Sequence, residues 1–185
     1  MKYLKIYEEY LDDDLDGELY IPKKSISGTF YHGTLIYDED FFSTLKIGQG
    51  DWEALWFSSE MDISEQFASR NLYDGDEDVL EIIFKVILNS DSIADIDYSL
   101  YQDLMEYYGK EDFRELIDIL KEDGFEGWSI PGSIDNDSYN DIALFVNYGW
   151  VDIKSIKFKL SKDEWSEFIS IHEAEDFFIK LKKGL

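Results

Sequence analysis

Three short segments of the chain carry polar side chains at the ends of apolar, strand-like runs. In residues 30–34, His32 and Gly33 follow two aromatic residues. In residues 54–68, Trp56 and Phe57 lead into a run of hydroxyl and acidic side chains, and residues 141–145 open on Asp141. Brought together, the three segments would surround one ligand with a histidine, an aromatic wall and a carboxylate.

Each segment also has a purely structural explanation. His32 could end a strand without any further role, and Trp56 and Phe57 could be ordinary core residues. Gly33 is the residue type that lets a backbone approach a ligand closely. The order and spacing of the segments, rather than any one of them, therefore favour a binding site.

Short strands and amphipathic helices are expected to position these residues. Runs of apolar residues predict strands at 29–35, 54–57, 79–88, 126–130, 142–146 and 153–160. Ser59 precedes an acidic turn and predicts the start of a helix that carries Phe67. Apolar residues at helical spacing predict further helices at 100–120 and 163–182. Without a regular alternation of strand and helix, the pattern is typical of the α+β class.

The composition is that of an ordinary globular domain. A chain of 185 residues fits one domain with a core of its own. It contains no cysteine, so disulfides and thiolate zinc sites are excluded. No stretch reads as a signal peptide or as a membrane span, because the longest apolar runs have the length of strands. We therefore expect a cytoplasmic protein, or one delivered into a host cytoplasm, without membrane contact.

The net charge of −25 restricts the partners. Residues 1–153 hold 36 of the 42 acidic residues and only 10 of the 17 basic ones. Such a body repels phosphate backbones, so a nucleic-acid substrate is not expected. It suits a basic protein partner, whose encounter the charge would speed. The alternative is that the acidity only keeps the protein soluble.

Taken together, the segments resemble the ADP-ribosyltransferase superfamily, in its diphtheria-toxin and poly(ADP-ribose)-polymerase branch. Tyr31 to Thr34 resemble the His-Gly-Ser/Thr segment of that branch, and Trp56-Phe57 resemble its Tyr-Phe segment. Ser64 and Phe67 stand at the positions of the family's serine and second tyrosine, and Asp141 stands where the family usually has glutamate. The aspartate is one methylene shorter and must approach its ligand more closely.

The resemblance covers about residues 27–160 and implies a fold and a reaction. The implied fold is a split β-sandwich of two small antiparallel sheets with flanking helices. Residues 1–26 would be a lead-in segment, and residues 161–185 an amphipathic helix packed on the domain. The implied function is mono-ADP-ribosylation of a protein target by a toxin or phage effector, with NAD as co-substrate and no metal.

The resemblance also implies a role for each residue. Asp141, His32 and Trp56 would be catalytic, with Asp141 stabilising the positive charge that develops on the nicotinamide-side ribose. The NAD-binding residues would be His32, Gly33, Thr34, Trp56, Ser58, Ser64 and Phe67. Two alternatives remain open at this point: a non-catalytic acidic binder that mimics nucleic acid and blocks a basic protein, and an NAD glycohydrolase.

Overall fold

The computed structural model describes residues 19–36, 54–70, 79–110, 113–131, 140–145, 152–162 and 164–184. These residues form one mixed sheet and four helices, which confirms the predicted α+β class. The strands are β1 (Lys23–Ile36), β2 (Leu55–Ser58), β3 (Leu80–Asp95), β4 (Gly127–Pro131), β5 (Asn140–Leu144), β6 (Asp152–Ser161), β7 (Glu164–Trp165) and β8 (Ile169–Ser170). The helices are α3 (Met61–Arg70), α4 (Tyr98–Tyr107), α5 (Phe113–Glu122) and α6 (Ile171–Lys182).

Two long strands organise the sheet. β1 and β3 pair antiparallel from one end to the other, with one register shift between Lys24 and Ile26. The first half of β3 also pairs antiparallel with β6, and its last residues pair parallel with β4. On one face of β3, every second residue from Ile82 to Leu88 is buried, and Ile83 on the other face is buried as well. This is the period-two pattern by which a strand faces a core.

The strand pairings close into a ring. The order β1-β2-β5-β4-β3 is completed by the pairing of β3 with β1. The predicted pair of small antiparallel sheets is therefore wrong in this respect, because β1 and β3 extend through both halves and link them by hydrogen bonds. The β3–β4 pair is parallel, which a purely antiparallel arrangement excludes.

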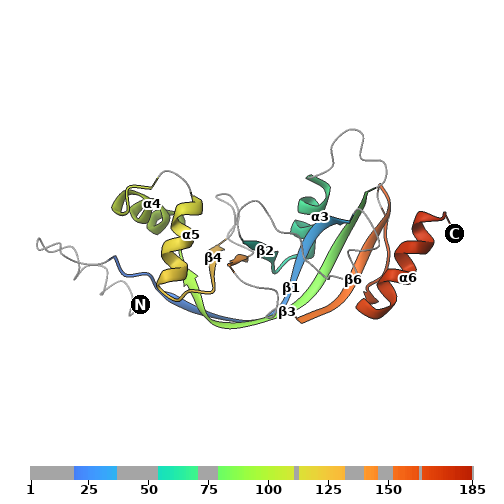
Figure 1. The fold of residues 1–185 in the computed structure, drawn as a ribbon, viewed down its shortest axis with the longest axis horizontal. Coiled ribbons are helices and arrows are strands. Elements are labelled where there is room, and N and C mark those ends of the chain that lie inside the picture. Colours follow the sequence, from blue (N-terminus) through green and yellow to red (C-terminus); the bar gives the residue numbers. More distant parts are fainter. Residues whose placement is uncertain are drawn as a thin grey trace, which may run out of the picture.

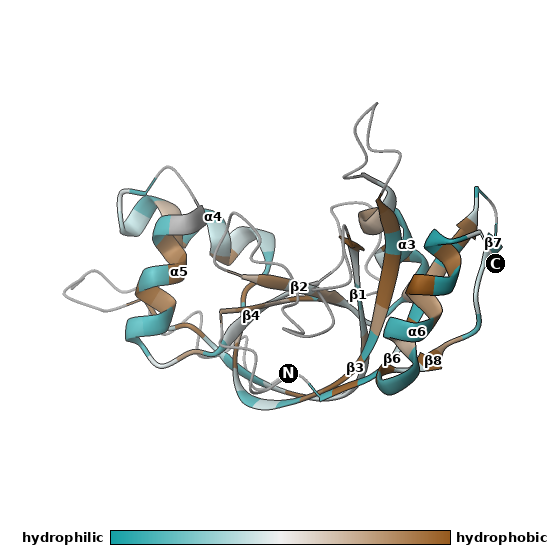
Figure 2. Cartoon of the chain, turned by 45° about the vertical axis from the view of Figure 1, so that its right-hand side comes forward, coloured by the Kyte–Doolittle hydropathy of each residue, from teal (hydrophilic) through white to brown (hydrophobic). Residues whose placement is uncertain are grey.

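The helices cover two separate cores (Figure 1). α6 lies beside β6 and contributes Ala174 and Phe178 to a core that contains Phe57 and Phe84. α4 and α5 lie at the opposite end and surround a second core around Trp128. The apolar stripes of α5 and α6 stand out in Figure 2. None of the described helices combines the length and the apolar character that crossing a membrane requires.

Several elements differ in extent from those expected. The single helix expected at 100–120 is divided into α4 and α5, because Gly109 adopts a φ of 61° after α4. The terminal helix begins at Ile171 instead of residue 163, since β7 and β8 precede it. Of the predicted lead-in segment, residues 1–18 lie outside the described residues, and β1 begins at Lys23.

Candidate functional site

A split between two strands creates a cavity. Among the described residues, β1 and β2 are bridged at one pair, Tyr31 and Ser58. Away from this pair the two strands diverge: β1 stays paired with β3, whereas β2 pairs with β5. The cavity has a volume of about 380 Å³, which falls in the range of small-molecule sites. It is lined by His32, Gly33, Thr34, Ala54, Leu55, Trp56, Phe57, Ser58, Ser64, Phe67 and Asp141.

All eight residues that the sequence singled out as a site lie in the wall of this cavity. They come from four elements that are far apart in the chain: β1, β2, α3 and β5. Ala54, Leu55 and Phe57 complete the apolar part of the lining. The roles of the eight residues stay predictions, but all eight line the same cavity and could therefore contact one ligand.

His32 is held in one orientation by its surroundings. Its ring lies 5.4 Å from that of Phe57 and stacks on Phe84 at 6.3 Å. Nδ1 is 2.7 Å from the carbonyl oxygen of Trp56. Because a carbonyl only accepts, Nδ1 must carry the proton, and in the neutral ring Nε2 is an acceptor. Nε2 is buried and has no hydrogen-bond partner in the part of the chain that the structure describes.

The charge state of His32 follows from its burial. Desolvation lowers the pKa of this imidazole from its ordinary value near 6.5, and the backbone bond to Trp56 opposes the shift only in part. The ring is therefore neutral at neutral pH. It presents one buried lone pair rather than a positive charge.

Asp141 is the second buried acceptor of the cavity. It lies opposite Ser58 on β2 and Ile130 on β4, in the strand that joins the two. Burial raises the pKa of its carboxyl group, and a hydrogen bond from the Ser58 side chain offsets part of that shift. Oδ1 is buried and receives no hydrogen bond from any described residue. Ser58 is itself fixed, since its hydroxyl accepts from the backbone N–H of Glu60 at 3.2 Å.

Gly33 makes room for a helix. A Cβ atom at this position would overlap the carbonyl oxygen of Ser64 and lie 3.0 Å from the backbone nitrogen of Ala68. From the sequence, Gly33 was expected to allow a ligand to approach the backbone. In the structure it also allows the close approach of the α3 backbone. This contact brings the buried Ser64 and the partly exposed Phe67 to the cavity wall.

Two aromatic side chains line the cavity from different elements. Trp56 comes from β2 and also packs against the second core, whereas Phe67 comes from α3 and is 37% exposed. Aromatic faces on separate elements can hold a flat ring between them. Phe84, which stacks on His32, was missed by the sequence analysis. Only the pairing of His32 with Phe84 across β1 and β3 could have revealed it.

Comparison with known proteins assigns neither a family nor a function to the chain. No family model matches the chain, and no curated protein matches it. Among solved structures, it is similar to a chain of the M. tuberculosis MbcT–MbcA toxin–antitoxin complex, with 10% identity and a TM-score of 0.40. The match covers 87% of this chain and 92% of the other. Similarity at this level does not establish a function, so the cavity has to carry the assignment.

Proposed function

We propose that the protein is an NAD-dependent ADP-ribosyltransferase that modifies a protein. The observation that carries the proposal is a pair of buried acceptor atoms in one cavity, His32 Nε2 and Asp141 Oδ1, which have no hydrogen-bond partner among the described residues. A buried polar atom without a hydrogen bond costs about 1–3 kcal/mol, so such atoms need a reason. A ligand that supplies two donors would remove both costs.

The kind of ligand follows from the donor and acceptor inventory. Both orphaned atoms accept, so the ligand must present hydroxyl or amino hydrogens to them. The aromatic walls of Trp56 and Phe67 add a slot for a flat ring. NAD supplies both features, because each of its riboses carries hydroxyl groups and its nicotinamide is a flat aromatic ring.

The reaction needs a negative charge beside the sugar. When the bond between nicotinamide and C1′ of the ribose breaks, its electron pair leaves with nicotinamide and the ribose becomes oxocarbenium-like. The Asp141 carboxylate would stabilise this charge, and the surrounding apolar wall would strengthen the interaction. The acceptor nucleophile then bonds to C1′ and releases its proton to solvent.

The other residues would position the two halves of the ligand. His32 would accept from a hydroxyl of the adenosine-side ribose, and Ser58 would orient Asp141. The Gly33 backbone and the Ser64 hydroxyl would hold the carboxamide, next to Thr34. These assignments follow from the family resemblance, and the position of each residue in the cavity wall supports them.

The partner side of the proposal rests on charge. A chain with a net charge of −25 favours a basic protein as acceptor and disfavours nucleic acid. The same charge favours a second candidate function, an acidic binder that blocks a basic protein without any catalysis. The setting we propose is a toxin or phage effector that acts in a cytoplasm.

Labelled NAD and a cell lysate test the proposal. We expect the wild-type protein to label a discrete band, Asp141→Ala to label none, and Asp91→Ala to match the wild type. Asp91 is an exposed carboxylate on β3, outside the cavity. Free nicotinamide without a band would indicate a glycohydrolase. If Asp141→Ala keeps the full biological effect, the protein is the acidic binder instead.

A further inference from the structure

α3 is held beside the cavity with little apolar packing of its own. Of its described side chains, only those of Ser64 and Ala68 are buried, and Phe67 is 37% exposed. Because stabilisation by burial grows with the apolar area removed from water, two small side chains contribute little to the docking of this helix. Polar contacts therefore carry a larger share in fixing the position of α3, and with it the two cavity residues Ser64 and Phe67.

A row of paired residues crosses the sheet beneath α3. Gly33 on β1 pairs with Ile83 on β3, and Ile83 pairs with Lys157 on β6. Directly paired residues project from the same face of a sheet. At one end of the row Gly33 meets the α3 backbone at Ser64, and at the other end the Lys157 side chain reaches the same helix. The helix is thus held at both ends of a row that spans three strands.

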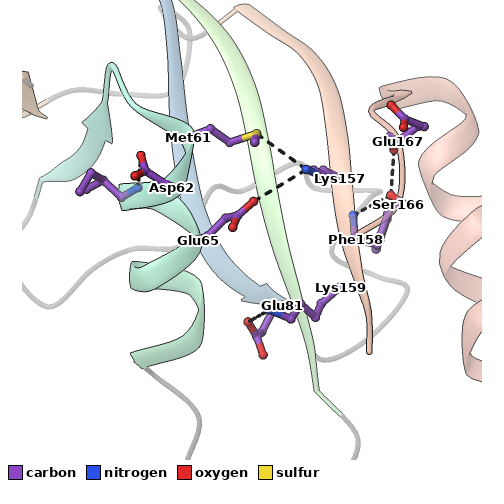
Figure 3. A network of polar contacts seen from close by, with 10 residues as sticks. Met61, Asp62, Glu65, Glu81, Lys157, Phe158, Lys159, Ser166 and Glu167 are labelled. Atoms are coloured by element: carbon purple, nitrogen blue, oxygen red, sulfur yellow. Dashed lines mark hydrogen bonds and ion pairs between the residues drawn. The ribbon is translucent and has the colours of Figure 1, made fainter. Parts of the chain in front are cut away.

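The Lys157 ammonium contacts two side chains of α3. It lies 3.7 Å from a carboxylate oxygen of Glu65 and 3.8 Å from the sulfur of Met61, as Figure 3 shows. The rings of Trp165 and Phe168 lie beside it, with centroids at 5.9 and 5.7 Å. The Lys157 side chain is only 16% exposed. Such an enclosed ion pair is screened less than a surface pair, and the loss of one partner leaves the other charge uncompensated.

The residues anchored by Lys157 and the residues of the cavity lie on opposite flanks of α3. Successive helical residues are rotated by about 100°, so the buried Ala68 marks the middle of the face that α3 turns to the sheet. Met61 and Glu65 follow on one flank of this face. Ser64 and Phe67 follow on the other flank, where they line the cavity. A rotation of α3 about its axis would break the first contacts and move the second pair relative to the ligand.

We propose that Lys157 is a positioning residue for the ligand of the cavity, because its ion pair with Glu65 fixes the rotation of α3. That rotation presents Ser64 and Phe67 to the nicotinamide ring and its carboxamide. The inference rests on the proposed function and adds to it a residue outside the cavity lining that controls the affinity for the nicotinamide half of NAD. The sequence analysis assigned no role to this lysine.

Calorimetric titration of nicotinamide, NAD and ADP-ribose tests the positioning role. Lys157→Met removes the charge and keeps a long side chain. We expect it to weaken nicotinamide and NAD binding about tenfold, a usual effect of a residue that acts through its neighbours. The affinity for ADP-ribose, which lacks the nicotinamide, should not change. The helix should stay docked in this variant, because the Ser69 hydroxyl still donates to the Glu81 carboxylate of β3 at 2.5 Å.

A second single variant and a double variant show whether the effect passes through the ion pair. Glu65→Gln is nearly isosteric at a side chain that is 31% exposed, so it should fold even if Lys157→Met does not. It should weaken nicotinamide binding to a similar degree. The double variant should bind no more weakly than the weaker single variant, because both changes remove the same interaction. Lys157→Arg keeps the charge and should recover most of the affinity.

Lys110→Met is the matched control. Lys110 pairs with Glu115 at 3.1 Å, at the end of the molecule that α4 and α5 occupy (Figure 1). Neither residue lines the cavity. The loss of this ion pair should leave the nicotinamide affinity unchanged, whatever small effect it has on stability.

Each contrary outcome has a distinct meaning. If Lys157→Met and Glu65→Gln bind nicotinamide as tightly as the wild type does, the positioning role is overturned and the proposed function stands. If ADP-ribose binding is lost to the same extent, or if Lys110→Met also loses nicotinamide, the effect is a general loss of structure and the positioning role is overturned. If the losses of the single variants multiply in the double variant, the two side chains do not act as a pair and the proposal is again overturned. If the wild type binds neither NAD nor nicotinamide, the proposed function falls and the positioning role falls with it.

Discussion

Gly33 and Ser64 meet backbone to backbone, so that no side chain fits between β1 and α3. A Cβ on Gly33 would overlap the Ser64 carbonyl oxygen. The contact places α3 directly over the split between β1 and β2, where the cavity lies. The position of α3, which brings Ser64 and Phe67 to the cavity wall, therefore depends on the absence of a methyl group at residue 33.

Gly33→Ala should reduce both the stability of the fold and the affinity of the cavity for nicotinamide. Overpacking typically costs about 1–3 kcal/mol, because the backbone of α3 must shift. Gly109→Ala is the matched control, since it strains a left-handed residue in an open turn remote from the cavity. Chemical denaturation should show both variants destabilised, whereas only Gly33→Ala should lose nicotinamide affinity. If Gly33→Ala and Gly109→Ala bind nicotinamide equally well, the position of α3 does not control ligand binding.

Asp141→Asn should lose most of its transferase activity and yet be more stable than the wild type at neutral pH. The pKa of this carboxyl is raised in the folded state, so folding disfavours its ionised form. The resulting loss of stability is present above the raised pKa and disappears as the pH falls through it. Transferase assays should show a loss of about 10²–10³-fold, as for other charge-stabilising groups. A variant that is less stable than the wild type at pH 7 would contradict this account.

His32 should remain neutral below its ordinary pKa near 6.5. Because the unfolded chain binds the proton first, His32 contributes stability that is lost as the pH falls below that value. Nitrogen chemical shifts should show the proton on Nδ1 and a titration midpoint below 6.5. His32→Gln should flatten the pH dependence of the unfolding free energy in this window. A proton on Nε2 would remove the acceptor on which the ligand assignment depends.

Phe67→Ala should separate binding from stability. Phe67 is 37% exposed at the cavity wall, so its truncation removes little core packing. If it stacks on the nicotinamide ring, NAD affinity should fall about tenfold, in line with the 1–3 kcal/mol of base–aromatic stacking. Tyr98→Ala, at 58% exposed on α4, is the control and should leave NAD affinity unchanged. Identical affinities for the two variants would exclude Phe67 from the stacking slot.

Local sequence patterns predicted those helices and strands that form mainly from their own residues. The helix after Ser59 is α3, and the expected strand at 153–160 is β6. In contrast, the strand expected at 79–88 continues to Asp95, so that Asn89 and Ser90 lie inside β3. There Asn89 pairs with Ser27 and Ser90 with Ile26, and this long-range pairing outweighs their weak strand propensity. No local pattern contains that information.

The site likewise has features that the sequence predicts and features that only the tertiary structure reveals. The eight predicted residues could be found because their order along the chain matched a known set of motifs. The contact of Gly33 with Ser64 and the stacking of Phe84 on His32 could not, because both depend on how distant segments pack.

The closed ring of strands also sets the order in which the site can be made during synthesis. β5 lies between β2 and β4 and is the last strand of the ring to leave the ribosome. Until Asn140–Leu144 has emerged, β2 and β4 have no partner in common and the carboxylate of the cavity does not yet exist. A nascent or truncated chain can therefore hold His32, Trp56 and Ser64 without having a complete pocket. A cell that makes this protein therefore meets the completed site only after β5 has left the ribosome.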